Sequence, residues 1–258
     1  MLIMKKRNAS TGNGVKDSQK NLNSYRNQMT VEFHKGDSLQ LIKKIPSNSI
    51  NLIYIDPPFA TTAQFWDEKV DWVKLFPEML RVLKDTGMLV IHCSVPFNYE
   101  LIRACKTPPS YSWYWFKPGP PTNYLNANQQ PLRCVEEILV WKKKKNTYYR
   151  QQIGEEERES FWSSGSDYYG TVKERKKTVM KGKTRTHFLD MKRSLDGFST
   201  RPKEMLQLMV KSYSTEGDTV LDLFCYKGLS GVVCKELGRN WIGFDKYHTP
   251  ELLLEENS

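Results

Sequence analysis

The fold is decided by the segment Asn51-Leu52-Ile53-Tyr54-Ile55-Asp56-Pro57-Pro58-Phe59. Its apolar, β-branched first half predicts a buried strand, which stops at an acid, two prolines and an aromatic ring. Proline fixes its own φ and restricts the residue before it, so the backbone after Asp56 is stiff. Ligands of open α/β sheets bind at the carboxyl ends of the strands, so the segment predicts a site as well as a strand.

The carboxylate of Asp56 and the carbonyl that follows it are two neighbouring hydrogen-bond acceptors. They suit an amino group with two hydrogens, such as the exocyclic amino group of a nucleobase. In this interpretation Phe59 stacks on that base. In the alternative interpretation the prolines only form a turn and Phe59 belongs to the core.

The length suits one large α/β domain with an insertion or two small domains, and the composition indicates an intracellular protein with a polyanionic partner. The chain has 258 residues and a formal net charge of +10, which favours nucleic acid first and an anionic membrane surface second. No apolar run approaches the ~20 residues that cross a bilayer, and no signal peptide is predicted. The five scattered cysteines include no CxxC pair, and the histidines lack metal spacing, so no metal site is predicted. His92 lies in a strand pattern and is expected to be a hydrogen-bonded histidine of the core or sheet edge.

Sequence patterns predict the remaining elements in order. Strands are expected near residues 31–34, 87–93, 111–116 and 134–141, and helices over 39–45, 68–84 and 97–105, with Pro77 kinking or splitting the second helix. The polar segment after Phe59 is expected to be flexible and able to move over a neighbouring site. Asp37, at the first strand-to-helix turn, is either a helix cap or a ligand acceptor.

The chain near its C-terminal end predicts a β-α-β unit. A strand over 219–224 leads through a turn with Gly228 into a helix that Gly238 caps, and a strand over 240–245 follows. A glycine turn at a helix N-terminus lets backbone amides approach a ligand. Asp245 follows Gly228 at close to the ~20 residues expected for a carboxylate that binds ribose hydroxyls.

Between these halves, residues 142–195 form a basic insertion with interleaved aromatic residues. Such a composition suits a phosphate backbone and unstacked bases, although a solvated, partly mobile insertion is the alternative. The expected DNA contacts are Lys142, Lys143, Lys144, Arg150, Lys173, Arg175, Lys176, Lys177, Lys183 and Arg185. We therefore divide the chain into a disordered tail (1–28), a catalytic half (29–141), this insertion, a cofactor half (196–249) and a C-terminal tail (250–258).

Three motifs together resemble the β group of amino-methylating DNA methyltransferases, which use S-adenosylmethionine. Gly36-Asp37 precedes the first helix, Asp56-Pro57-Pro58-Phe59 matches the catalytic tetrad, and residues 221–245 match the cofactor segment. The order of catalytic strand, variable target-recognition region and cofactor strand is also that of the group. The resemblance implies a Rossmann-like α/β domain with a mostly parallel, twisted sheet, a circularly permuted motif order and a basic target-recognition insertion.

The resemblance also implies roles for single residues. The tetrad, Asp56, Pro57, Pro58 and Phe59, is expected to be catalytic. The cofactor, S-adenosylmethionine, is expected to place its adenine at Asp37, its ribose at Asp245 and its amino-acid end at Asp222. Further cofactor contacts are expected from Phe224, Tyr226, Gly228, Ser230 and Lys203.

The implied function is a site-specific DNA adenine-N6 methyltransferase that acts on a base flipped out of double-stranded DNA. An Asp-led tetrad leans toward adenine within the group, and N4-cytosine or RNA methylation is the alternative. One departure favours another reading, a catalytically silent DNA-binding subunit: Tyr226 and Leu229 replace small residues of the usual glycine turn. Dimers are common in the group, so a homodimer or a partner subunit is expected, although the sequence identifies no interface.

Overall fold

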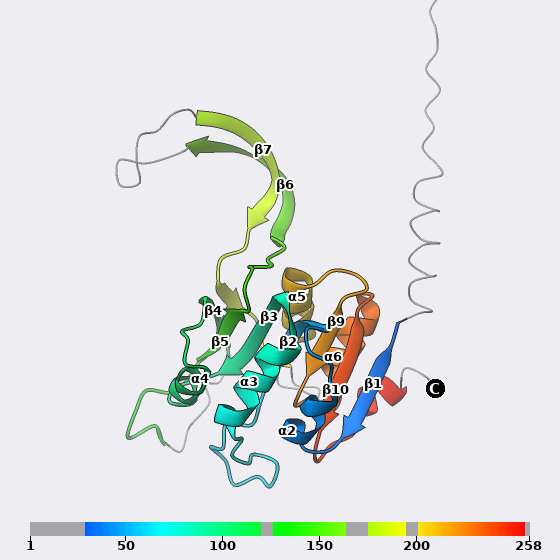
Figure 1. Ribbon diagram of the computed structural model, residues 1–258. Helices are drawn as coiled ribbons and strands as arrows, with labels where there is room; N and C mark the ends of the chain where they lie inside the picture. Colours follow the sequence, from blue (N-terminus) through cyan, green and yellow to red (C-terminus); the bar gives the residue numbers. More distant parts are fainter. Residues whose placement is uncertain (1–28, 120–125, 164–174, 195–200, 256–258) are drawn as a thin grey trace, which may run out of the picture.

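The computed structural model describes residues 29–119, 126–163, 175–194 and 201–255 (Figure 1). The predicted N-terminal tail and Lys173 lie outside the described residues. None of the described helices is long and apolar enough to cross a membrane.

An eight-stranded sheet forms the centre of the molecule, in the order β1-β10-β9-β2-β3-β5-β4-β8. Its bounds are β1 Val31–Lys35, β2 Ile50–Ile55, β3 Leu83–Cys93, β4 Tyr111–Phe116, β5 Val135–Lys142, β8 Phe188–Asp190, β9 Thr219–Asp222 and β10 Asn240–Asp245. The strands from β1 to β3 in this order are parallel, and β5 runs antiparallel to both β3 and β4. The predicted mostly parallel α/β sheet is confirmed.

The pairing of β2 with β9 brings together the two halves of the permuted motif order. Ile53 lies opposite Leu221, so the catalytic and cofactor strands are neighbours in space although they are distant in the chain. Parallel strands share one carboxyl edge, and β1, β9 and β10 therefore end beside β2. This edge is called the carboxyl edge below, and the opposite edge, where β3 begins, the amino edge.

Alternating side chains of the central strands build two hydrophobic layers. Ile53 and Ile55 of β2 pack with α3 (Trp72–Val82) and α4 (Phe97–Cys105) on one face. Leu52 and Tyr54 pack with α5 (Lys203–Tyr213) and α6 (Leu229–Glu236) on the other. Burial on both faces explains why β2 reads as a continuous apolar run.

Two predicted helices and the predicted C-terminal tail differ from the structure. The first helix is short, α2 (Ser38–Leu41) followed by a 3-10 turn, η1 (Ile42–Lys44). Helix α3 begins at Trp72 because Asp71 caps it, accepting from the amide of Lys74, and Pro77 lies within it without splitting it. The predicted C-terminal tail includes a helix, α7 (Glu251–Glu255), whose Leu253 is buried.

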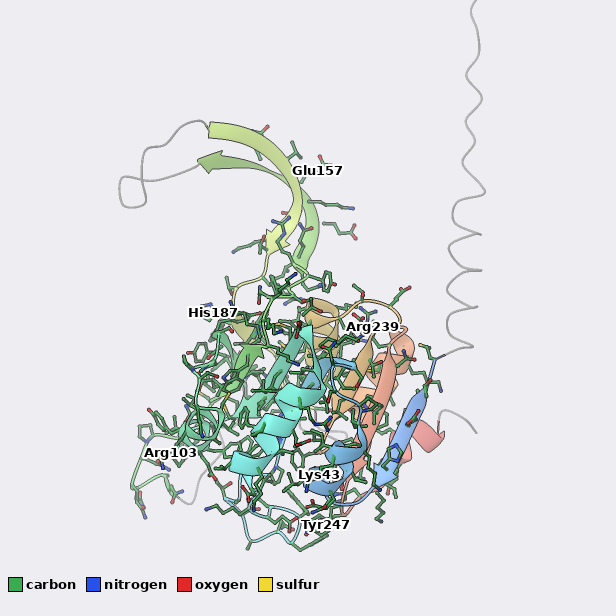
Figure 2. The ribbon with its side chains drawn as sticks, in the orientation of Figure 1. Lys43, Arg103, Glu157, His187, Arg239 and Tyr247 are labelled. Carbon is green, nitrogen blue, oxygen red and sulfur yellow. The ribbon has the colours of Figure 1, made fainter. Side chains whose placement is uncertain are left out.

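The insertion contains a long hairpin that forms its own two-stranded sheet, β6 (Gln152–Ser163) and β7 (Arg175–Thr184). The hairpin extends away from the main sheet (Figure 1). Figure 2 shows Glu157 on the hairpin and Tyr247, which follows β10, at opposite ends of the molecule. The hairpin therefore projects from the amino edge, away from the carboxyl edge.

Candidate active site

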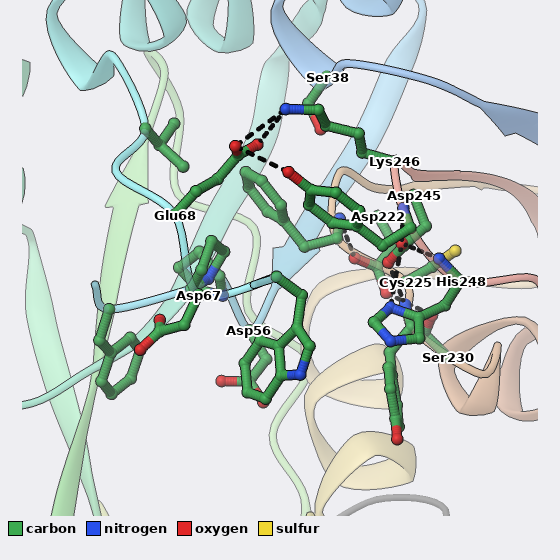
Figure 3. Close-up of a pocket in the computed structure, with 18 of the residues that line it drawn as sticks. Ser38, Asp56, Asp67, Glu68, Asp222, Cys225, Ser230, Asp245, Lys246 and His248 are labelled. Atoms are coloured by element: carbon green, nitrogen blue, oxygen red, sulfur yellow. Dashed lines mark hydrogen bonds and ion pairs between the residues drawn. The ribbon is translucent and has the colours of Figure 1, made fainter. Parts of the chain in front are cut away.

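A cavity of about 970 Å³ opens at the carboxyl edge (Figure 3). Each of β1, β2, β9 and β10 delivers an acid to its wall, because each strand ends at or just before one. The cavity is lined by all four tetrad residues and by most of the predicted cofactor residues. These are Asp37, Asp56, Pro57, Pro58, Phe59, Asp222, Phe224, Tyr226, Ser230 and Asp245.

Asp56 is held by a chain of alternating charges. The guanidinium of Arg201 donates to Asp56 Oδ1 at 2.6 Å and lies 3.0 Å from Glu136 Oε2. Lys117 Nζ lies 2.6 Å from the other Glu136 oxygen. Burial raises the pKa of Asp56, and the charge and hydrogen bond of Arg201 oppose that rise. The Asp56 side chain remains 35% exposed, so it is fixed but still accessible to a ligand.

Arg201 is the main functional residue that sequence reasoning missed. It precedes Pro202 at the start of α5 and lines the cavity. No local sequence signal indicated this contact, because Arg201 lies 145 residues after Asp56 and meets it only in the fold. The predicted cofactor contact two positions later, Lys203, is not among the described residues that line the cavity, and it forms an ion pair with Glu236 between α5 and α6.

Phe59 combines the two alternatives that the sequence left open. Its ring stacks on Phe97 with centroids 4.8 Å apart and an interplanar angle of 25°. It packs against the core on that side and also lines the cavity. An anchored ring at a cavity wall is suited to stacking on a flat ligand.

Asp222 is the acid with the most strongly altered proton affinity in the cavity. It accepts from the hydroxyl of Ser230 and from the amide of Phe224. Burial raises the pKa of Asp222 to about 7, and these hydrogen bonds oppose the rise. A cationic ligand group beside Asp222 would favour its ionised form.

Asp245 holds two turns together. It accepts from the amides of Tyr226, Tyr247 and His248 at 2.8, 2.9 and 2.7 Å. A carboxylate has about four lone-pair sites, so these bonds occupy most of them. Asp37 likewise combines two roles, because it caps α2 through the amide of Gln40 and lines the cavity.

The turn after β9 departs from the usual glycine pattern without closing the cavity. Tyr226 adopts a left-handed conformation with φ of 48°, and its ring meets His248 edge-on with centroids 4.5 Å apart. The ring is part of the wall and is 38% exposed. Gly228 has φ of 87°, and a Cβ there would lie 2.5 Å from a Pro250 atom, so the turn requires this glycine. The volume of the cavity and its carboxylate acceptors therefore fit a nucleoside-bearing cofactor with a cationic end.

The segment after the tetrad is held in place by side-chain hydrogen bonds. Asp67 accepts from the amides of Ala60, Thr61 and Thr62 at 2.6–2.9 Å. Glu68 then binds Lys246 and the hydroxyl of Tyr247, which joins this segment to the turn after β10 (Figure 3). The expected flexible segment is thus a bridged loop beside the cavity.

The predicted DNA contacts lie away from this cavity. Lys143 donates to the Leu83 carbonyl and Lys144 pairs with Asp85, so both are at the amino edge. Arg175, Lys176, Lys177 and Lys183 belong to β7, while Arg150 and Arg185 flank the hairpin. The basic strand β7 faces an acidic strand, with Lys181 opposite Glu157 and 3.9 Å from Glu155. The insertion is therefore less uniformly basic than the sequence pattern indicated.

The sheet has a hydrophobic layer on each face, and an acid-lined cavity with the Pro-Pro tetrad lies at its carboxyl edge. These features define a Rossmann-like methyltransferase. The family model described as DNA methylase, which covers N6-adenine and N4-cytosine enzymes, matches residues 50–252. The chain belongs to this family of DNA methyltransferases. The methyl donor of the family is S-adenosylmethionine.

Relatives agree with this assignment. The type II methyltransferase M.HinfI of Haemophilus influenzae is 27% identical over 263 residues, covering 88% of this chain and 67% of the relative. M.BamHI of Bacillus amyloliquefaciens is 25% identical, and this chain spans only 54% of its length. The DNA adenine methyltransferase YhdJ of Escherichia coli is 27% identical over 240 residues, covering 86% of this chain and 80% of the relative.

Solved structures support the fold. The cytosine-N4-specific PvuII DNA methyltransferase matches with a TM-score of 0.59 at 18% identity, covering 84% of this chain and 83% of its own. The DNA modification methylase TTHA0409 of Thermus thermophilus, complexed with S-adenosyl-L-methionine, matches with a TM-score of 0.57 at 17% identity, covering 88% and 94%. At these identities the likeness concerns the fold alone.

Proposed function

We propose that this chain transfers a methyl group to N6 of an adenine that has been flipped out of double-stranded DNA. The observation that carries the proposal is the shared cavity: the tetrad and the cofactor segment line one space, with Asp56 fixed in its wall. A base inside a duplex does not expose its amino nitrogen to such a cavity, which is why flipping is required.

The chemistry depends on how the amino group is held. Asp56 Oδ1 is committed to Arg201, which leaves Oδ2 to accept one amino hydrogen, and the Pro57 carbonyl accepts the other. Two acceptors favour a tetrahedral nitrogen whose lone pair is localised rather than delocalised into the ring. When bound, S-adenosylmethionine supplies the electrophilic sulfonium methyl. The contribution of the chain is positioning and electrostatics.

Arg201 favours the ionised, accepting form of Asp56 against the effect of burial. Without a neighbouring cation, a buried carboxyl would hold its proton more tightly and would donate rather than accept. After transfer the nitrogen carries an extra proton, which the ionised Asp56 is placed to receive. Phe59 supports the base by stacking, from a ring whose position Phe97 fixes.

The adenine preference rests on the Asp-led tetrad and on the likeness to YhdJ. Both adenine and cytosine present the same kind of amino group to the two acceptors. The alternative of a silent subunit depended on Tyr226, whose ring lines the cavity without filling it, and this favours the catalytic proposal.

Transfer of labelled methyl from S-adenosylmethionine to DNA tests the proposal. We expect the wild-type chain to label DNA and Asp56→Ala to lose transfer by a factor on the order of 10² or more, because one of the two acceptors is gone. DNA binding, measured by anisotropy, should stay within about twofold. Wild-type transfer rates in Asp56→Ala would remove Asp56 from the mechanism.

A further inference from the structure

A second cavity, of about 550 Å³, lies at the root of the hairpin. It is formed by the first residues of β4 and by the chain that leads into β6 and out of β7. We call it the root cavity. Its lining is Tyr111, Ser112, Trp113, Tyr114, Asn146, Tyr148, Arg185, Thr186 and His187.

The root cavity is separate from the methyltransferase cavity. The two cavities share none of the described lining residues, and the root cavity lies at the base of the hairpin, whereas the other cavity contains Asp56 and the cofactor segment.

The walls of the root cavity are aromatic and partly exposed. Tyr114 is 39% exposed and Tyr148 is 36% exposed. His187 meets the Tyr114 ring edge-on with centroids 5.6 Å apart. Trp113 forms the buried side, and its indole nitrogen donates to the hydroxyl of Tyr213, which fixes its orientation. Flat rings around an open space are suited to stacking a planar ligand.

Arg185 gives the root cavity an unsatisfied cationic donor. Its Nε is buried and has no hydrogen-bond partner among the described residues. None of the described residues that line the cavity is acidic. A buried donor without a partner is unfavourable, so a ligand that accepts from it is favoured. The planar guanidinium is matched to phosphate oxygens.

We propose that the root cavity binds one unpaired nucleotide, with its base against Tyr148 and its phosphate at Arg185. The proposal rests on the proposed function, because a DNA strand is the expected source of that nucleotide. A free nucleotide offers the same base and phosphate and is the other source. In either case the site is distinct from the one that receives the target base.

The test measures binding of a short, fluorescein-labelled single-stranded oligonucleotide to the full chain by anisotropy. Arg185→Ala and Tyr148→Ala should each weaken binding at least about fivefold, since a phosphate contact or a stacking face is lost. Tyr148→Phe keeps the ring and should bind as wild type. Lys211→Ala is the matched control, because this exposed lysine of α5 lies near the hairpin root but does not line the cavity.

Unlabelled dAMP and a blunt duplex as competitors identify the source. If only the unlabelled single strand displaces the labelled oligonucleotide, the root cavity binds a DNA strand. If dAMP displaces it equally well, the root cavity binds free nucleotides. The proposal is overturned if both alanine variants bind as wild type, or if the blunt duplex competes as well as the single strand. Unchanged affinity for S-adenosylmethionine shows that the variants are folded.

Methyl transfer to duplex DNA separates this proposal from the proposed function. If the wild-type chain methylates duplex DNA but both alanine variants bind the oligonucleotide as tightly as the wild type, only the root-cavity proposal is overturned. Absence of transfer by the wild type, with weakened binding by the variants, overturns the methyltransferase proposal and supports the nucleotide site.

Discussion

Asp56 is subject to two opposing influences, and Arg201 sets their balance. Burial raises the pKa of the carboxyl, while the guanidinium 2.6 Å away lowers it. Glu136 and Lys117 extend the pair into a chain of alternating charge, so Arg201 is itself held in place. The acid proposed to bind the substrate amino group thus depends on three residues outside the tetrad motif.

Arg201→Met should move the pH dependence of kcat/KM toward higher pH. The sign follows from Asp56: its pKa rises without the cation, so a higher pH is needed to ionise it. At neutral pH we expect a loss on the order of 10². Arg201→Lys should recover part of both effects, and Lys203→Met, which breaks an ion pair outside the cavity, should leave the profile unchanged. An unshifted profile in Arg201→Met would refute this role.

Asp222 should make cofactor binding depend on pH. Its pKa of about 7 means that it becomes ionised as pH rises from 6 to 8, and a cationic ligand group binds the ionised form. Calorimetry with S-adenosylmethionine should therefore show affinity rising over this range in the wild type and a flatter curve in Asp222→Asn. Since an α-amino group titrates near 8, the difference between the two curves isolates Asp222. Identical curves would contradict this assignment.

At the scale of elements, the molecule is organised by the carboxyl edge and the hairpin. Parallel strands gather the acids at one edge, and the bridged loop after Phe59 closes one side of the cavity through Glu68 and Lys246. The hairpin stands apart from this arrangement. A two-stranded hairpin is marginal on its own in water, which favours a role in contacting a partner.

Removing residues 152–184 should weaken DNA binding while leaving cofactor binding unchanged. The amide of Arg185 donates to the carbonyl of Gln151, so a short Asn-Gly turn can join the two ends without strain. We expect anisotropy to show at least a tenfold loss of DNA affinity, because the basic side chains of β7 that are predicted to contact DNA phosphates are removed. Loss of S-adenosylmethionine affinity, or unchanged DNA affinity, would contradict this division of roles.

Local signals explain which features the sequence predicts. The tetrad and the β-α-β unit are each encoded within a short segment. The buried His92, predicted to be a hydrogen-bonded histidine, has its Nε2 atom 2.7 Å from the Tyr54 hydroxyl. Arg201 and Asp56 are distant in sequence and meet only through the fold, so their pairing was not predictable locally. The acidic run on β6 was visible, but its neutralising position opposite β7 depends on the hairpin register.

At the scale of the whole molecule, the methyltransferase cavity and the hairpin lie at opposite ends (Figure 2). DNA held in the cavity would therefore lie at the end of the molecule opposite the hairpin. A second copy or a partner subunit that presents its hairpin to the cavity is one way to bring the two together on DNA.

The central claim is that the cavity methylates an amino group on a DNA base. Mass spectrometry of nucleosides from DNA incubated with the full chain and S-adenosylmethionine tests it most directly. We predict N6-methyladenine with the wild type and none with Asp56→Ala. DNA without any methylated nucleoside, or with a methyl group on carbon such as 5-methylcytosine, would contradict the account.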